Sequence, residues 1–171
     1  MANEWTDILD KDEEILWQGR PDGGFVFQPS MVYMTIFSLF FAGFALFWML
    51  MASQAGGGFW MFGLIHFSVG IGMLVATLCG GMWMRRHTWY TLTDRRAFIA
   101  TDMPIRGRRL ESYPITADTM IDYHQAKRNS VYFATRTKRG NNGTREVPVG
   151  FEQLDDAPQV LKMIRQIQQD A

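Results

Sequence analysis

The sequence predicts a membrane α-helical hairpin joined to a small all-β or α+β domain. Residues 23–84 contain no Lys, Arg, Asp or Glu, although the 171-residue chain has 17 basic and 17 acidic side chains. A charge at the centre of a bilayer costs roughly 2.5–3.5 kcal/mol, so a long charge-free segment suits a membrane. Alternating β-branched and aromatic residues follow this segment, and a stretch with helical periodicity ends the chain.

The charge-free segment divides into two predicted transmembrane helices. Residues 31–52 and 59–84 are apolar, and as helices both exceed the roughly 30 Å hydrocarbon core. Residues 53–58 contain Ser, Gln and three glycines, which favours a tight reversal between the two helices. Aromatic residues typical of membrane interfaces mark both sides: Tyr33 and Trp83 on one, Trp48 and Trp60 on the other.

The basic residues predict that both termini are cytoplasmic. Lys11 and Arg20 precede the first span, Arg85 and Arg86 follow the second, and the Gly-rich turn has neither Lys nor Arg. The positive-inside rule then places the turn outside a multi-pass protein of the cell (inner) membrane. A cleaved signal peptide is the alternative, but such a leader would be too long and begins with an acidic segment.

Small residues form a candidate packing stripe along the second span. They recur every four positions as Ser68, Gly72, Ala76 and Gly80, and the first span offers Ser38, Ala42 and Ala45. Such stripes let helices approach closely in lipid. We expect packing within the hairpin, and homodimerisation stays open as an alternative.

The two polar parts of the chain carry opposite charges. Residues 1–30 have seven acidic and two basic side chains, a net charge of −5, so residues 85–171 carry +5 in this neutral chain. The two parts are expected to attract each other. An anionic leaflet would also attract the basic part, at about 1 kcal/mol per nearby Lys or Arg, and salt would weaken both effects.

Residues 85–171 are expected to form antiparallel strands closed by one helix. Strands are predicted at 87–93, 97–101, 108–113, 120–125, 131–136 and 147–151. The sequence Arg-Gly-Asn-Asn-Gly at 139–143 favours a hairpin turn. A helix at 156–169 would be capped by Asp156, with Gln159 three residues later, and its apolar stripe must rest on the sheet. The outline is a small barrel or sandwich with a helical plug.

Three segments carry a family resemblance. Residues 13–21 (EEILWQGRP), 90–99 (YTLTDRRAFI) and 150–154 (GFEQL), in this order around two apolar spans, resemble bacterial membrane proteins with a pleckstrin-homology-like (PH-like) domain. The resemblance covers nearly the whole chain. It implies about seven antiparallel strands in a barrel-like sheet with a C-terminal helix, and it implies no catalytic residues. A strand at 13–19 would supply the seventh, and disorder of the N-terminal segment is the alternative.

Basic residues of the domain are the candidate lipid-binding or partner-binding residues. They are Arg85, Arg86, Arg106, Arg108, Arg109, Arg136, Lys138 and Arg139, with Lys127, Arg128 and Arg145 nearby. One interpretation is an anionic headgroup site, and the other is a set of orientation signals and solvated loop charges. We favour non-specific attraction to acidic lipid over a specific headgroup. Nucleic acid is not an expected partner, because the chain has no recognition helix, zinc module or stacking platform.

No motif predicts catalysis, a cofactor or a metal. The HExxH, GxxxxGK and GxSxG patterns are absent from the sequence. The twelve methionines and the single Cys79 are expected to pack as apolar residues rather than to bind metal. His66 is the only basic side chain inside the charge-free segment. We expect a neutral imidazole bonded to Ser or backbone of the neighbouring helix, and a transport role for it ranks lowest.

These observations predict a non-enzymatic integral membrane protein. Its domain would present a binding or scaffold surface to a protein partner, to a second copy or to anionic lipid. The alternative is an accessory subunit of a membrane transporter or enzyme complex that uses the hairpin as its interface.

Overall fold

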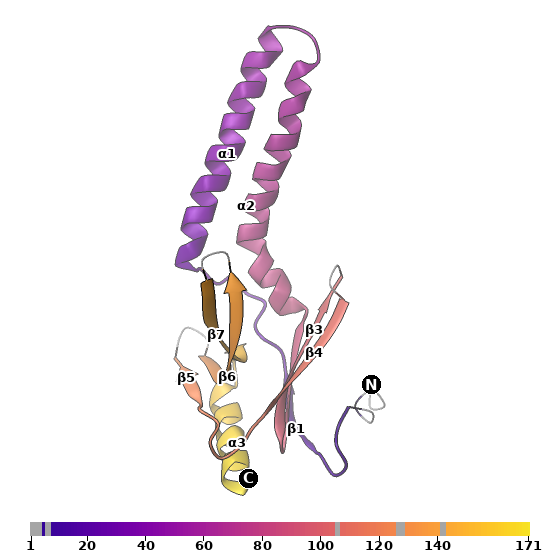
Figure 1. The fold of residues 1–171 in the computed structure, drawn as a ribbon, viewed down its shortest axis with the longest axis vertical. Coiled ribbons are helices and arrows are strands. Elements are labelled where there is room, and N and C mark those ends of the chain that lie inside the picture. Colours follow the sequence, from indigo (N-terminus) through magenta and orange to yellow (C-terminus); the bar gives the residue numbers. More distant parts are fainter. Residues whose placement is uncertain (1–4, 6–7, 105–106, 126–128, 141–142) are drawn as a thin grey trace. The chain divides into compact units, whose positions relative to one another are not determined.

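The computed structural model describes residues 5, 8–104, 107–125, 129–140 and 143–171 (Figure 1). The chain forms two compact units. One is the helical unit, Gly23–Met84, and the other is the domain, which combines the chain up to Asp22 with the chain from Arg85 to Ala171.

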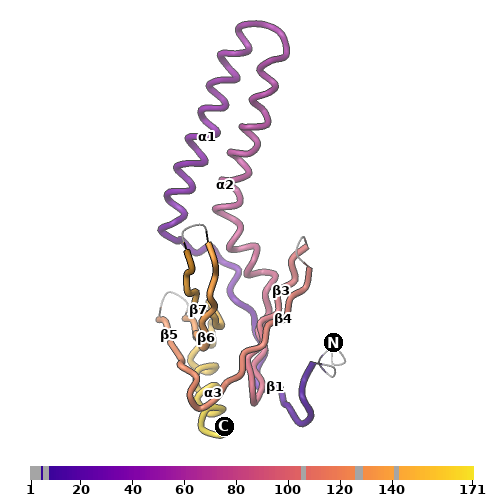
Figure 2. Tube along the Cα trace, viewed as in Figure 1, coloured from indigo at the N-terminus to yellow at the C-terminus, as the bar shows by residue number. Residues whose placement is uncertain are grey.

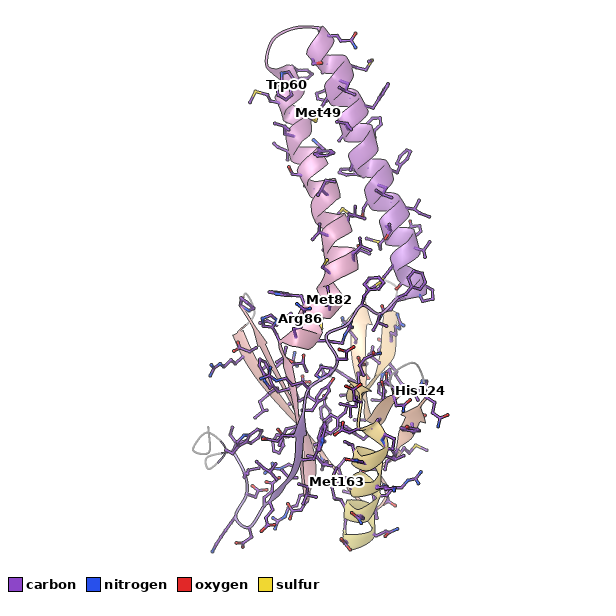
Figure 3. The ribbon with its side chains drawn as sticks, turned by 180° about the vertical axis from the view of Figure 1, so that it is seen from behind. Met49, Trp60, Met82, Arg86, His124 and Met163 are labelled. Carbon is purple, nitrogen blue, oxygen red and sulfur yellow. The ribbon has the colours of Figure 1, made fainter. Side chains whose placement is uncertain are left out.

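The helical unit consists of two long antiparallel helices. Helix α1 spans Pro29–Gln54, a 3-10 turn η2 spans Phe59–Met61, and α2 spans Phe62–Arg86. Both long helices have the length and apolar composition needed to cross a membrane. The reversal between them uses Gly56 and Gly57, both at φ +76°, a conformation that residues with a Cβ rarely adopt. Figure 3 shows side chains projecting outward all along the two helices.

The domain contains two antiparallel sheets. The first has the order β1-β2-β3-β4, with β1 at Ile15–Gly19, β2 at Thr88–Thr93, β3 at Arg96–Met103 and β4 at Gly107–Pro114. The second has the order β5-β6-β7, with β5 at Asp122–His124, β6 at Asn129–Gly140 and β7 at Gly143–Leu154.

Strand β1 joins the N-terminal segment to the domain. It pairs antiparallel with β2, for example Gln18 opposite Thr91 and Gly19 opposite Tyr90, although the helical unit lies between the two strands in the sequence (Figure 2). The sequence left open whether this part of the N-terminal segment is a strand or disordered. The structure shows that residues 15–19 form a strand.

The expected barrel-like closure is wrong for the described residues. Their strand pairs leave two separate sheets, with no ladder joining one to the other. Strand β4 ends at Pro114, which has no backbone N–H to donate, and β5 has three residues and pairs only with β6. The second sheet continues instead as a long two-stranded ribbon, because β6 and β7 pair as far as Gly140 and Gly143.

The core lies between the two sheets and helix α3, which spans Ala157–Asp170. Its largest fully buried side chains include Leu92, Phe151, Leu154 and Ile164. Val160, Ile164 and Ile167 of α3 are buried there, as the predicted apolar stripe requires.

Asp156 begins α3 in a different way from the predicted capping box. Its side chain makes no capping hydrogen bond to the helix. The Asp156 carboxylate instead accepts a hydrogen bond from the indole Nε1–H of Trp17 at 2.6 Å, and the Trp17 ring packs on Phe151. A residue of β1 thus connects the first sheet to the second sheet and to α3.

Candidate binding surfaces

An ion pair fixes the N-terminal segment to the first sheet. The Glu13 side chain is fully buried, and its carboxylate accepts hydrogen bonds from Arg96 at 2.6 Å and from the Thr93 hydroxyl at 2.7 Å. Asp10 lies 2.9 Å from the same Arg96 guanidinium. The Arg96 hydrogen bond dominates and lowers the pKa of Glu13 from 4.5 to about 2, against the opposing effect of burial. The segment is therefore anchored at the β2–β3 turn.

Two of the predicted binding arginines share one carboxylate partner. Glu111 on β4 accepts from Arg109 at 2.6 Å and also from Arg136 on β6, and Arg136 contacts the Tyr113 hydroxyl. The hydrogen bonds that Arg136 donates to Tyr113 and to Glu111 raise the pKa of its guanidinium group. Arg136 therefore links the two sheets, and its charge is partly neutralised within the domain.

Arg108 forms a weaker ion pair near the turn that joins β3 to β4. Its Nε lies 3.2 Å from Asp102 on β3, and both side chains are exposed. Exposed pairs of this kind contribute about 0.2–1 kcal/mol, so Arg108 can exchange Asp102 for an external anion at little cost. Arg106 lies outside the described residues.

The far half of the second sheet carries basic residues with no such partner. This part consists of Thr135–Gly140 of β6 and Gly143–Pro148 of β7, and we name it the basic ribbon. It contains the cross-strand pair Lys138–Arg145 and, next to Lys138 in the chain, Arg139. All three side chains are exposed, and none has a carboxylate within 4 Å among the described residues. Like charges directly opposite each other on adjacent strands are destabilising. An anionic partner would remove that repulsion.

Arg85 and Arg86 differ in their surroundings. Arg85 donates from Nε to the Asp22 backbone oxygen at 3.1 Å, and the Asp22 amide in turn donates to Gln153 at 2.9 Å. These bonds hold together the two points at which the chain leaves the domain. Arg86, at the end of α2, is exposed (Figure 3).

The contact between the two long helices uses a different set of small residues from the predicted stripe. Gly63 and Gly70 are buried, and a Cβ at Gly70 would lie 2.8 Å from the Ala42 Cβ. Ser38, Ala42 and Ala45 are the buried residues of α1, as predicted. Ser68, Gly72 and Ala76 are exposed and Gly80 is half-buried, with nothing within 4 Å of a Cβ at Gly72 or Gly80. The expected packing of this stripe within the hairpin is therefore not seen, and packing against another helix stays a prediction.

His66 makes its polar contact with its own helix rather than with the neighbouring one. Its Nδ1 lies 3.5 Å from the Phe62 carbonyl oxygen one turn earlier, and its ring lies beside Phe41 and Phe62. The expected polar partner on the adjacent helix is not found among the described residues.

Sequence reasoning missed a surface on the outer face of the first sheet. Arg20 lies over the Trp89 ring at 4.7 Å. Trp89 is directly opposite Ala100, and Ala100 is opposite Leu110, so these three side chains share one face. We name Arg20, Trp89, Ala100, Leu110 and Arg108 the outer-face patch. The alternation of Trp89, Thr91 and Thr93 along β2 was the available signal for this face.

Within the part of the chain that the structure describes, no group of three or more His, Cys, Asp or Glu side chains is arranged to hold a metal ion. Comparison of the chain with protein-family models, curated proteins and solved structures finds no match.

Proposed function

We propose that this chain is a membrane-anchored, non-enzymatic binding module with a PH-like domain on the cytoplasmic side. Two helices that can cross a membrane, antiparallel sheets and a C-terminal helix agree with what the family resemblance implies. The absence of Lys and Arg from the turn between the helices supports the orientation, with both termini in the cytoplasm.

The proposed ligand of the domain is the anionic surface of the membrane, contacted by the basic ribbon. The observation that carries this proposal is the cross-strand pair Lys138–Arg145, with Arg139 beside it and no carboxylate partner among the described residues. Each Lys or Arg near an anionic leaflet contributes about 1 kcal/mol, so three such residues give a weak, salt-sensitive attachment. The covalent connection to the helices keeps the ribbon at high effective concentration near the membrane, where a weak contact is sufficient.

A charge-reversal comparison tests this function. The full-length protein is placed in nanodiscs of phosphatidylcholine, with or without phosphatidylglycerol, and amide hydrogen exchange is measured by mass spectrometry. Phosphatidylglycerol should slow exchange in the basic ribbon, and added salt should reverse the effect. The double variant K138E/R145E should abolish the lipid dependence. K162E/R165E, the same charge change at exposed positions of α3, should retain it. Equal exchange in both lipids for the native protein would refute the proposal.

A second candidate function is that of an accessory subunit whose helices bind another membrane protein. The exposed face of α2 around Ser68, Gly72 and Ala76 supports it, because small side chains there leave room for a neighbouring helix. Gly72→Leu adds a large side chain on this face, at a position where a Cβ has no atom within 4 Å. It should remove a co-purifying membrane protein in mild detergent if this function is correct, whereas K138E/R145E should not.

A further inference from the structure

The outer face of the first sheet is divided into a covered half and an open half. Trp5 packs edge-on against Phe98 at 5.5 Å, and both Phe98 and Thr91 are buried. One row further along the strands, Leu110 is 41 % exposed and Trp89 and Ala100 are half-buried. The N-terminal segment thus shields the row that contains Phe98 and leaves the next row open. This open row forms part of the lining of a broad groove.

The open row is amphipathic. Its apolar members are Trp89, Ala100 and Leu110, and exposed arginines flank it, with Arg20 on the Trp89 side and Arg108 beside Leu110 on β4. A Trp ring beside guanidinium groups is the combination favoured in the headgroup layer, where the ring lies among glycerol and acyl carbons and arginine binds phosphate oxygens.

The chain places this row close to the proposed membrane boundary. Four residues, two at the end of α2, one in a turn and the first of β2, separate Met84, the last residue of the helical unit, from Trp89. That path spans at most about 13 Å. Phe25 and Phe27 are exposed and lie within a few residues of the start of α1. Exposed aromatic residues next to a membrane span are typical of an interfacial belt.

We infer that the outer-face patch is a second membrane contact, in which Trp89 and Leu110 enter the headgroup layer and Arg20 and Arg108 bind lipid phosphate. The inference rests on the proposed membrane anchorage. The patch differs from the basic ribbon in its physical basis. Burial of apolar surface does not depend on lipid charge, and phosphate is present in zwitterionic lipid as well, so this contact persists where the ribbon releases the membrane.

Site-directed spin labelling tests the inference in the full-length protein. The only native cysteine is removed as Cys79→Ser, and a nitroxide is attached at Leu110→Cys, Thr137→Cys or Lys162→Cys, all exposed positions. Thr137 lies in the basic ribbon, and labelling it leaves Lys138, Arg139 and Arg145 in place. Each protein is reconstituted in vesicles of phosphatidylcholine, alone or mixed with phosphatidylglycerol. Power-saturation spectroscopy then compares collisions with oxygen, which partitions into lipid, and with a water-soluble nickel chelate. The label at 110 should lose nickel accessibility and keep oxygen accessibility in both vesicle types, and the label at 162 should stay open to nickel.

Two results would overturn the inference. Nickel accessibility at 110 equal to that at 162 would place the patch in water. Loss of both nickel and oxygen accessibility at 110 would show that protein, rather than lipid, covers it. The label at 137 separates this failure from that of the proposed function, because its accessibility should change only when phosphatidylglycerol is present. A responsive label at 137 with an aqueous label at 110 would leave the proposed function standing and remove the outer-face patch from it.

Discussion

The helical unit and the domain keep opposite kinds of side chains inside. The buried residues of α1 and α2 are small, namely Ser38, Ala42, Ala45, Gly63 and Gly70, and large apolar side chains face outward. The domain buries large side chains such as Phe98, Phe151 and Leu92. Removal of apolar surface from water drives the second arrangement, and close backbone packing in an apolar medium explains the first. The same substitution should therefore have different consequences in the two units.

The largest expected difference concerns phenylalanine truncation. Phe151 is completely buried and contacts the rings of Tyr90, Phe133 and Trp17 at 4.7–5.5 Å. Phe151→Ala should lower the free energy of unfolding of the domain by about 3–5 kcal/mol, measured by denaturant titration of the full-length protein in detergent. Phe40→Ala in α1, where the side chain is 74 % exposed, should leave that transition unchanged. Similar losses in both variants would contradict the comparison.

A smaller effect is expected at the buried ion pair between Glu13 and Arg96 in the domain. The charge-free helical unit has no counterpart to this pair. The pKa of Glu13 is about 2 in the folded protein against an ordinary value of 4.5. A lowered pKa stabilises the fold above pH 4.5, and the contribution disappears as the pH falls from 4.5 toward 2. It amounts to about 3 kcal/mol for a shift of this size.

Thermal unfolding between pH 7 and pH 2.5 checks this contribution. The native protein should lose stability steeply below pH 4.5, and Glu13→Gln should be less stable at pH 7 and show a much flatter acid dependence. Glu14→Gln is the matched control. The Glu14 side chain lies next to Glu13 in the sequence, is exposed, and has no ion pair among the described residues. Parallel pH profiles for native and Glu13→Gln proteins would show that the pair contributes little.

Local patterns in the sequence predicted most elements of the fold. Missing charge revealed the two apolar helices, and a high density of aromatic and β-branched residues revealed β2. Period-two alternation revealed β6 and β7, and the stripe of Val160, Ile164 and Ile167 revealed a helix packed on a sheet. Each of these signals depends on residues close together in the chain. The division into two sheets depends instead on which strands pair, and nothing local specifies that β5 pairs with β6 alone.

The candidate surfaces were less predictable for the same reason. Glu13 and Arg96 are 83 residues apart, and Trp17 and Asp156 are 139 apart, so neither contact is visible before the strands are assembled. Glu111 of β4 reaches Arg136 of β6 only because these two strands come together in the fold. In the helical unit, apolar residues surround both helices, so no polar face indicated that α1 contacts Gly70 rather than Gly72.

That helix contact gives a third prediction of intermediate size. An added methyl group at Gly70 would lie 2.8–3.0 Å from the Cβ, Cα and N atoms of Ala42, so α1 and α2 must move apart. Gly70→Ala should destabilise the helical unit by about 1–3 kcal/mol, seen as a lower midpoint when sodium dodecyl sulfate is titrated into mixed micelles and helicity is followed by circular dichroism. Gly72→Ala meets no atom within 4 Å and should keep the native midpoint. If only Gly72→Ala lowered it, the predicted stripe would be the true contact face.

The smallest effect is expected where β1 attaches to α3. Trp17→Phe keeps an aromatic ring against Phe151 but removes the Nε1–H donor to Asp156. A hydrogen bond to a partly exposed carboxylate contributes about 1–1.5 kcal/mol, so the domain should unfold at a slightly lower denaturant concentration. A double-mutant cycle with Asp156→Ala isolates the bond, because each single variant already removes it and the double variant should cost less than the sum. Strict additivity would mean that Trp17 stabilises the domain through ring packing alone. Strand β1, which precedes the helical unit in the sequence, would then be attached to the core of the domain by apolar contact, like the other elements that form this core.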